Sequence, residues 1–257
     1  MPSSLSRIVG LIGSGLSLIW TVVQLSSFDP EATQHLDLGL RFVRFSLDSL
    51  GFTMVLLTNA VIFLIYLANF QRSIVNETRF TALTFLMQFG LIGIFTSSTI
   101  LGFYIFWELT LLPVFLILYW FGTFEKQKAL LQFFLYTLLG SLAMLLSVIG
   151  LMHVTNQQTY EALLAADLSQ LGNTGILLMG GFLLAFAVKI PLFPFHTWQP
   201  DTYNTAPLPG VMLLAAVMSK MATYGLLRWV LPMLPEGVAT YGHWIIVLSV
   251  ISIVYAS

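Results

Sequence analysis

The chain has 257 residues, of which only 8% are charged and 58% are hydrophobic, and its mean hydropathy is +0.90. A soluble domain carries about 25% charged residues, so the composition excludes a soluble enzyme and a disordered tail. The net charge of −1 leaves no electrostatic footprint for nucleic acid. With no Cys, these residues offer no disulfide, no Cys-ligated zinc and no iron–sulfur cluster. The composition indicates a polytopic membrane protein.

Long apolar runs predict about eight membrane helices, because a helix needs roughly 20 residues to cross the hydrocarbon core. The third and fourth runs form one stretch whose single charge is Glu108, and Thr96-Ser97-Ser98 predicts the turn between them. The expected fold is therefore all-α, a polytopic transmembrane helix bundle. The runs cover 8–27, 49–70, 80–98, 99–121, 129–152, 173–197, 208–231 and 241–257.

The two ends of the chain carry separate expectations. The first run follows Arg7 but is too long for the apolar part of a signal peptide, and no small-residue cleavage site follows it. We interpret it as a retained helix. The last run stops at Ser257 after about 17 residues with no polar tail, which is typical of a cut chain.

The distribution of Lys and Arg among the loops predicts an N-terminus on the inner side, by the positive-inside rule. The outer side then holds Arg41, Arg44 and Arg228. The inner side holds the larger set, namely Arg7, Arg72, Arg79, Lys126 and Lys128.

Two loops contain periodic patterns. Alternation of Leu36, Leu38, Leu40 and Phe42 with polar residues or glycine predicts a short strand within the outer loop 28–47. Apolar residues at helical spacing over 157–171 predict an amphipathic helix at the membrane interface.

Three charges fall near the middle of separate membrane runs: Glu108, Lys189 and Lys220. Each costs about 2.5–3.5 kcal/mol by insertion scales unless it faces protein or water. A structural ion pair is the plain alternative, but a Glu108–Lys189 pair alone would leave Lys220 uncompensated. Three charges at similar depth favour a hydrated relay.

The helix that carries Lys189 is predicted to be discontinuous within 173–197. Pro191 and Pro194 remove two backbone donors and free carbonyls in the preceding turn. Such freed groups persist in a membrane only beside protein or water, and a lysine at a helix break is similar to the ion sites of transporters. A packing kink is the alternative.

Other titratable residues lie near helix ends. His196 and Asp201 are candidates for a proton path, and a packing or interface role for His196 is equally open. No His pair has metal-ligand spacing and no phosphate-binding loop is present, so we expect neither a metal nor a cofactor in this chain.

The motifs around these charges resemble the antiporter-like membrane subunits of respiratory complex I. Phe106-Trp107-Glu108-Leu109 with Pro113 is similar to the family's glutamate helix, and the segment 188–201 to its broken helix. The segment 220–228 is similar to its second lysine helix, and Phe133-Phe134-Leu135-Tyr136-Thr137 with Gly140-Ser141 to the helix between them. The motifs stand in family order and the resemblance covers about 45–231.

The resemblance implies that Glu108 and Lys189 form a pair whose separation tunes the lysine's affinity for a proton, and that Lys220 passes protons laterally. It implies proton translocation driven by electron transfer from NADH to quinone in other subunits, with no redox cofactor in this chain. The implied partners are the lipid bilayer and other membrane subunits of the complex, in the bacterial inner membrane. The implied organisation is N-terminal helices at 1–79, a five-helix antiporter-like unit at 80–231 and a further helix beginning in 232–257.

The sequence also departs from the family pattern. Gln199 and Thr202-Tyr203 replace residues that often stand there, so no proton role carries over to the family's histidine after the Asp. The family is also usually about twice as long, with a second repeat. The alternative functions are a D-type subunit of a multi-subunit Na⁺(K⁺)/H⁺ antiporter or a membrane subunit of an energy-converting hydrogenase. A scaffold whose charges are only structural pairs is a third.

Overall fold

The computed structural model describes residues 3–36, 42–71, 76–123, 126–166 and 168–256. Within these residues it is a bundle of long helices, seven of which are long and apolar enough to cross a membrane. An eighth apolar helix, Asn173–Lys189, is shorter because it ends at a break. The predicted all-α membrane bundle of about eight helices, one of them discontinuous, is confirmed.

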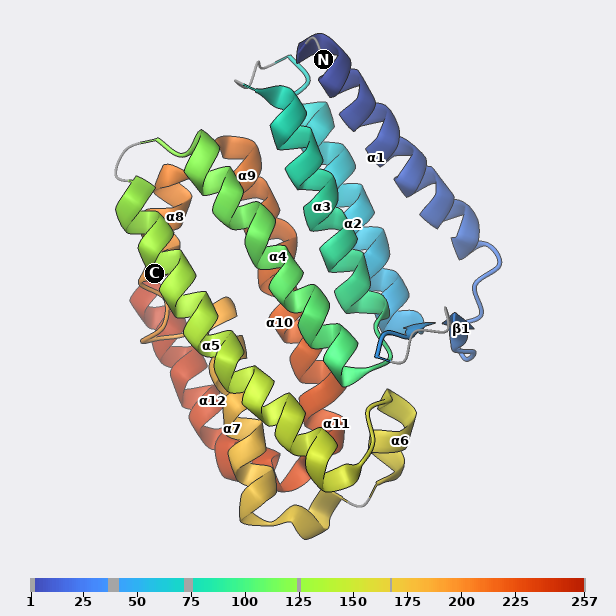
Figure 1. The fold of residues 1–257 in the computed structure, drawn as a ribbon, viewed down its shortest axis with the longest axis vertical. Coiled ribbons are helices and arrows are strands. Elements are labelled where there is room, and N and C mark those ends of the chain that lie inside the picture. The colour runs from blue at the N-terminus through green and yellow to red at the C-terminus, as the bar shows by residue number, and fades with distance from the viewer. Residues whose placement is uncertain (1–2, 37–41, 72–75, 124–125, 167, 257) are drawn as a thin grey trace.

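Three helices form the N-terminal part of the bundle: α1 (Ser3–Leu25), α2 (Ser49–Ala68) and α3 (Glu77–Thr96). They lie side by side in Figure 1, coloured blue to teal. A small antiparallel hairpin of β1 (Gln34–Leu36) and β2 (Phe45–Leu47) joins α1 to α2, with Leu36 opposite Phe45. The Asp48 side chain caps α2 by accepting a hydrogen bond from the Gly51 amide at 2.9 Å.

The second part of the bundle contains α4 (Ile100–Phe121), α5 (Lys126–Thr155) and the two halves of the broken helix. The halves are α7 (Asn173–Lys189) and α8 (Trp198–Thr205). Residues 97–99 form the predicted turn between α3 and α4, and Thr99 caps α4 through the Gly102 amide. In Figure 1, α5 lies between α4 and α7.

The next membrane-spanning segment runs from Leu208 to Met233 and is called the rod below. It is regular α-helix only in parts. Its α-helical segments are α9 (Leu208–Leu213), α10 (Ser219–Gly225) and α11 (Leu231–Met233). Two wider π turns separate them, η2 (Leu214–Met218) and η3 (Leu226–Val230). The last helix, α12 (Pro235–Ala256), packs against α7.

One loop prediction lies largely outside the described residues, and one needs correction. The strand predicted from Leu36 to Phe42 falls mostly on 37–41, which are outside the described residues, as are Arg41 and Arg72 of the charge distribution; the described residues on either side form β1 and β2. The helix predicted over 157–171 is only α6 (Tyr160–Ala165) followed by the 3₁₀ turn η1 (Leu168–Leu171). It cannot begin at 157 because the Gln158 carbonyl and the Tyr160 amide hydrogen-bond to the α3–α4 turn.

Candidate functional site

Lys189 is the last residue of α7 and lies inside the bundle with only 3% of its surface exposed. Its ammonium lies 5.6 Å from the centre of the Trp107 ring and 5.9 Å from that of Phe133. Both distances are within the range in which an aromatic ring attracts a cation, worth about 2 kcal/mol when the cation is desolvated. Helices α4 and α5 therefore supply an aromatic cage for the charge at the end of α7.

Glu108 is half-buried on α4, next to Trp107 in the sequence. Its carboxylate interacts with the hydroxyl of Ser141 on α5 and with the charge of Lys189. Among the described residues, no direct ion pair within 4.0 Å joins Glu108 and Lys189. The two charges thus interact across a gap of more than 4.0 Å rather than in direct contact.

The backbone break after Lys189 is held by hydrogen bonds from side chains on both sides of it. The Trp198 indole nitrogen donates to the Val188 carbonyl at 2.9 Å, which satisfies an acceptor left free where α7 ends. On the other side, the Phe193 amide donates to the Ser252 hydroxyl of α12 at 2.9 Å. Freed backbone groups need such partners in a membrane, so the break is built into the fold at this point.

Gly140 lets α5 approach α7 one turn before the lysine. A Cβ added to Gly140 would lie 3.2 Å from the Ala185 Cα and 3.3 Å from a methyl group of Val188. Any larger residue would push α7 away from α5. The close packing of these helices sets the position of Lys189 relative to Phe133.

The structure does not bring Lys220 into this buried pair. Its side chain is exposed, and its ammonium donates to the Ala215 carbonyl at 2.8 Å. Ala215 belongs to the π turn η2, whose wider backbone leaves carbonyls available. Lys220 therefore lies on the surface of the helix bundle, while Lys189 lies inside it.

The other predicted site residues lie apart from the pair. His196 is half-buried in the break, where its ring centre lies 4.8 Å from that of Tyr255 and 5.6 Å from that of Phe193. Its Nδ1 has no hydrogen bond to the part of the chain that the structure describes. Asp201 of α8 forms an ion pair with Lys128 of α5 at 3.0 Å. Both of those side chains are partly exposed, at 32% and 58%.

Sequence reasoning did not identify several residues that shape the site. The cage members Trp107 and Phe133 and the carboxylate partner Ser141 stand inside the matched motifs but were not given roles. Trp198, within the matched segment 188–201, likewise has a role at the break that the sequence does not indicate. One feature of the sequence could have pointed to them. Each lies either in a motif that contains a charged site residue or in the motif of the helix packed beside it.

A helical membrane bundle with a caged lysine at a helix break is similar to the ion sites of membrane transporters. The model of the family described as "NADH:quinone oxidoreductase/Mrp antiporter, TM" matches residues 97–257. The chain belongs to this family.

Individual relatives agree with the family. The chain is 38% identical over 216 residues to a chloroplastic NAD(P)H-quinone oxidoreductase chain 4 of Aethionema grandiflorum, covering 83% of this chain and 43% of that protein. It is 32% identical over 262 residues to the NADH-ubiquinone oxidoreductase chain 4 of Arabidopsis thaliana, covering 98% and 52%. The chain thus spans about half the length of the curated relatives it matches.

Solved structures extend the comparison. A chain of respiratory complex I from Thermus thermophilus with bound NADH superposes with a TM-score of 0.84 at 30% identity, covering 96% of this chain and 53% of that chain. The Mrp complex from Dietzia sp. gives a TM-score of 0.80 at 18% identity, covering 96% and 47%. At that identity the second likeness concerns the fold alone.

Proposed function

We propose that this chain is part of a proton-translocating membrane subunit of an NADH:quinone oxidoreductase, corresponding to the subunit called M or chain 4. The relatives at 32–38% identity that carry the name chain 4 support this proposal. Electron transfer takes place in other subunits, and this chain acts as a non-redox member of the complex. Its partners are the other membrane subunits and the surrounding lipid. Location of the chain in a bacterial inner membrane stays a prediction.

The observation that carries the proposal is the buried Lys189 at a helix break, facing Glu108 across a gap. The aromatic cage and the carboxylate stabilise the protonated form of a lysine in this setting, whereas burial destabilises it. These opposing contributions make its protonation sensitive to small movements of α4 against α7. Such movements, driven from elsewhere in the complex, would load and release one proton.

We further propose that residues 80–231 are the translocating unit. This segment contains most of α3 and all of α4 and α5, the broken helix α7–α8 and nearly the whole rod from Leu208 to Met233. The charged pair and the exposed Lys220 all lie within it. The N-terminus is proposed to lie on the inner side, which the loop distribution of Lys and Arg supports.

Substitution of Lys189 by Ala in the complete complex tests the function. Sealed vesicles would be given NADH and quinone, with electron transfer and the growth of the pH gradient measured together. We expect the gradient to be lost while the complex assembles. Arg79→Ala is the control because Arg79 is exposed at the start of α3. Wild-type pumping by Lys189→Ala would exclude the proposed role.

The antiporter and hydrogenase alternatives receive no specific support, because the Mrp likeness concerns the fold alone. Co-purification of the native complex separates the possibilities. NADH oxidation coupled to quinone reduction in the purified assembly supports the proposal. An assembly without that activity that exchanges Na⁺ for H⁺ would contradict it.

A further inference from the structure

A line of buried polar side chains runs through the N-terminal helices, away from the Glu108–Lys189 pair. On α3 the line consists of Glu77, Thr81, Thr84 and Gln88, all buried. Their spacing of three or four residues places them on one face of the helix. The line extends over twelve residues, a rise of roughly 16 Å, and therefore reaches about half-way across the membrane. Lipid-facing residues of a membrane helix are apolar, so this face is built for contact with protein or water.

At Gln88, direct side-chain hydrogen bonds join this line to polar residues of α1 and α2. The Gln88 amide donates to the Asn59 oxygen of α2 at 2.7 Å and to the Ser17 hydroxyl of α1 at 3.1 Å. Asn59 in turn donates to the Thr21 hydroxyl of α1 at 2.7 Å. We name this group of four, Ser17, Thr21, Asn59 and Gln88, the amide cluster. It joins all three helices at mid-membrane.

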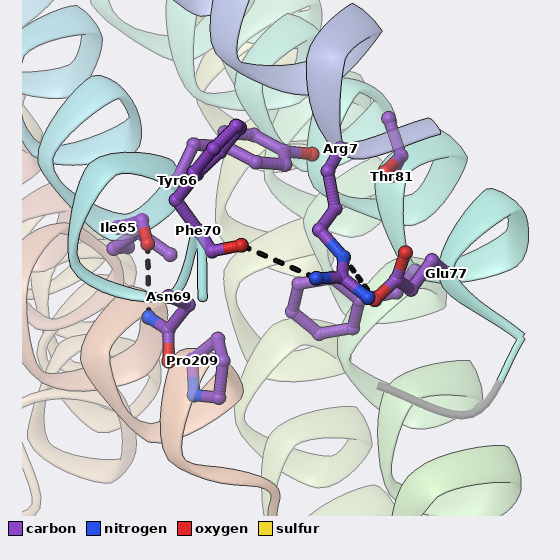
Figure 2. Close-up of a pocket in the computed structure, with 9 residues that line it drawn as sticks. Arg7, Ile65, Tyr66, Asn69, Phe70, Glu77, Thr81 and Pro209 are labelled. Atoms are coloured by element: carbon purple, nitrogen blue, oxygen red, sulfur yellow. Dashed lines mark hydrogen bonds and ion pairs between the residues drawn. The ribbon is translucent and has the colours of Figure 1, made fainter. Parts of the chain in front are cut away.

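One end of the line opens into a small cavity, shown in Figure 2. The cavity has a volume of about 30 Å³, and Arg7, Tyr66, Asn69, Glu77 and Thr81 supply its polar lining. Among the described residues, the buried Tyr66 hydroxyl has no hydrogen-bond partner, and it points toward Arg7 and Thr81 in Figure 2. A water molecule needs about 10–15 Å³ of such space and two to four polar partners. The cavity has the volume for one water molecule, and the Tyr66 hydroxyl lines it.

The other end of the line opens at the opposite end of α1, beside the hairpin. A cavity of about 310 Å³ lies there, and Thr21, Gln24 and Gln34 supply its polar lining. Thr21 therefore belongs both to this cavity and to the amide cluster. At the first end, the hydroxyls of Thr81 and Thr84 are the polar neighbours of Tyr66, and Thr84 lies one turn from Gln88.

We propose that α1, α2 and α3 enclose a polar path that holds water at both ends and is closed at mid-membrane by the amide cluster. Its ligand is water, and it is separate from the proposed translocation site. Carboxamide groups donate and accept hydrogen bonds but do not carry a proton at neutral pH. The cluster therefore interrupts a path that would otherwise let protons leak through the N-terminal helices.

Radiolytic hydroxyl-radical footprinting of the intact wild-type complex tests the water. Radicals form from bound water, so a buried tyrosine is oxidised only where water lies beside it. Tyr66 should be oxidised and Tyr224 should not, because Tyr224 is also buried, at 2% against 8% exposed, but its hydroxyl donates directly to the Phe95 carbonyl at 3.0 Å. Oxidation of Tyr66 no faster than that of Tyr224 would overturn the proposal.

The closure is tested by paired substitutions at Asn59 and Gln88 in sealed vesicles without NADH. Replacement of both by Ala removes the amides and leaves space, so an imposed pH gradient should decay faster than in wild type. Replacement of both by Leu removes the amides but fills the space, so the decay should stay at the wild-type rate. No leak in the Ala variant, or an equal leak in both variants, contradicts the closure. If the double Ala variant does not assemble, Gln88→Ala alone is measured in the same way.

Discussion

The indole nitrogen of Trp198 donates a hydrogen bond of 2.9 Å to the Val188 carbonyl, across the break between α7 and α8. The same indole packs edge-on against Phe133, with ring centres 5.5 Å apart. Phe133 is in turn one wall of the cage around Lys189. One side chain thus satisfies the broken backbone and supports the ring that faces the buried charge.

Replacement of Trp198 by Phe should destabilise the break while keeping the aromatic contact. The Val188 carbonyl would be left buried without a partner, which costs about 1–3 kcal/mol. Thermal unfolding of the purified complex should show a lower midpoint for this variant. Trp244→Phe is the matched control because Trp244 is 63% exposed. Equal midpoints for the two variants would mean that the hydrogen bond contributes little.

Replacement of Glu108 by Gln should reduce proton pumping without loss of assembly, because the side-chain shape is kept and only the charge is removed. A charge pair about 4 Å apart is worth about 4 kcal/mol at an effective dielectric constant of about 20, and less at a larger separation. We expect the initial rate of gradient formation to fall about tenfold or more, since a tenfold change corresponds to about 1.4 kcal/mol. Ser141→Ala should have a smaller effect because it removes only a neutral partner. Normal pumping by the Glu108→Gln variant would argue for a structural pair.

Replacement of Lys220 by Ala should leave stability nearly unchanged, within about 0.5 kcal/mol, because the side chain is exposed in this part of the protein. If Lys220 passes protons laterally, pumping should be lost all the same. Measuring unfolding and gradient formation on one preparation separates the two effects. Retained pumping would remove Lys220 from the proposed relay.

Replacement of Gly140 by Val should force α5 and α7 apart. Its side chain would meet Ala185 and Val188 where the two helices pack closely, and such overpacking costs about 1–3 kcal/mol. Both the unfolding midpoint and the pumping rate should fall, because Lys189 follows Val188 directly. Gly242→Val is the control, since no atom lies within 4 Å of a Cβ added there. The idea fails if the two substitutions behave alike.

Replacement of Asp48 by Asn tests a second charge pair, far from the caged lysine in the sequence. Asp48 pairs with Arg228, whose side chain is only 8% exposed and stacks on Tyr160 at 3.7 Å. Asn keeps the cap of α2 but leaves the buried guanidinium without its counter-charge, at a cost of about 3 kcal/mol. Arg228→Ala should cost less, because the remaining carboxylate is 23% exposed. The order of the two unfolding midpoints checks this assignment.

Much of the architecture was predictable because a bilayer imposes a length on every crossing segment. The eight runs, the turn at 97–99 and the break after Lys189 follow from apolar length and from proline chemistry. The loops were predicted less well. The hairpin and the shortened α6 depend on backbone pairing with the α3–α4 turn, and such long-range pairing has no local signature.

The sequence by itself determined that three charges lie in apolar runs and which motifs surround them. Only the tertiary structure decided that Lys189 is buried against Glu108 while Lys220 faces outward. The physical reason is that a helix which is apolar on all sides has no periodicity to distinguish its protein-facing side. The side that is buried is decided by the neighbouring helices, here through the close approach at Gly140 and the aromatic cage of Trp107 and Phe133.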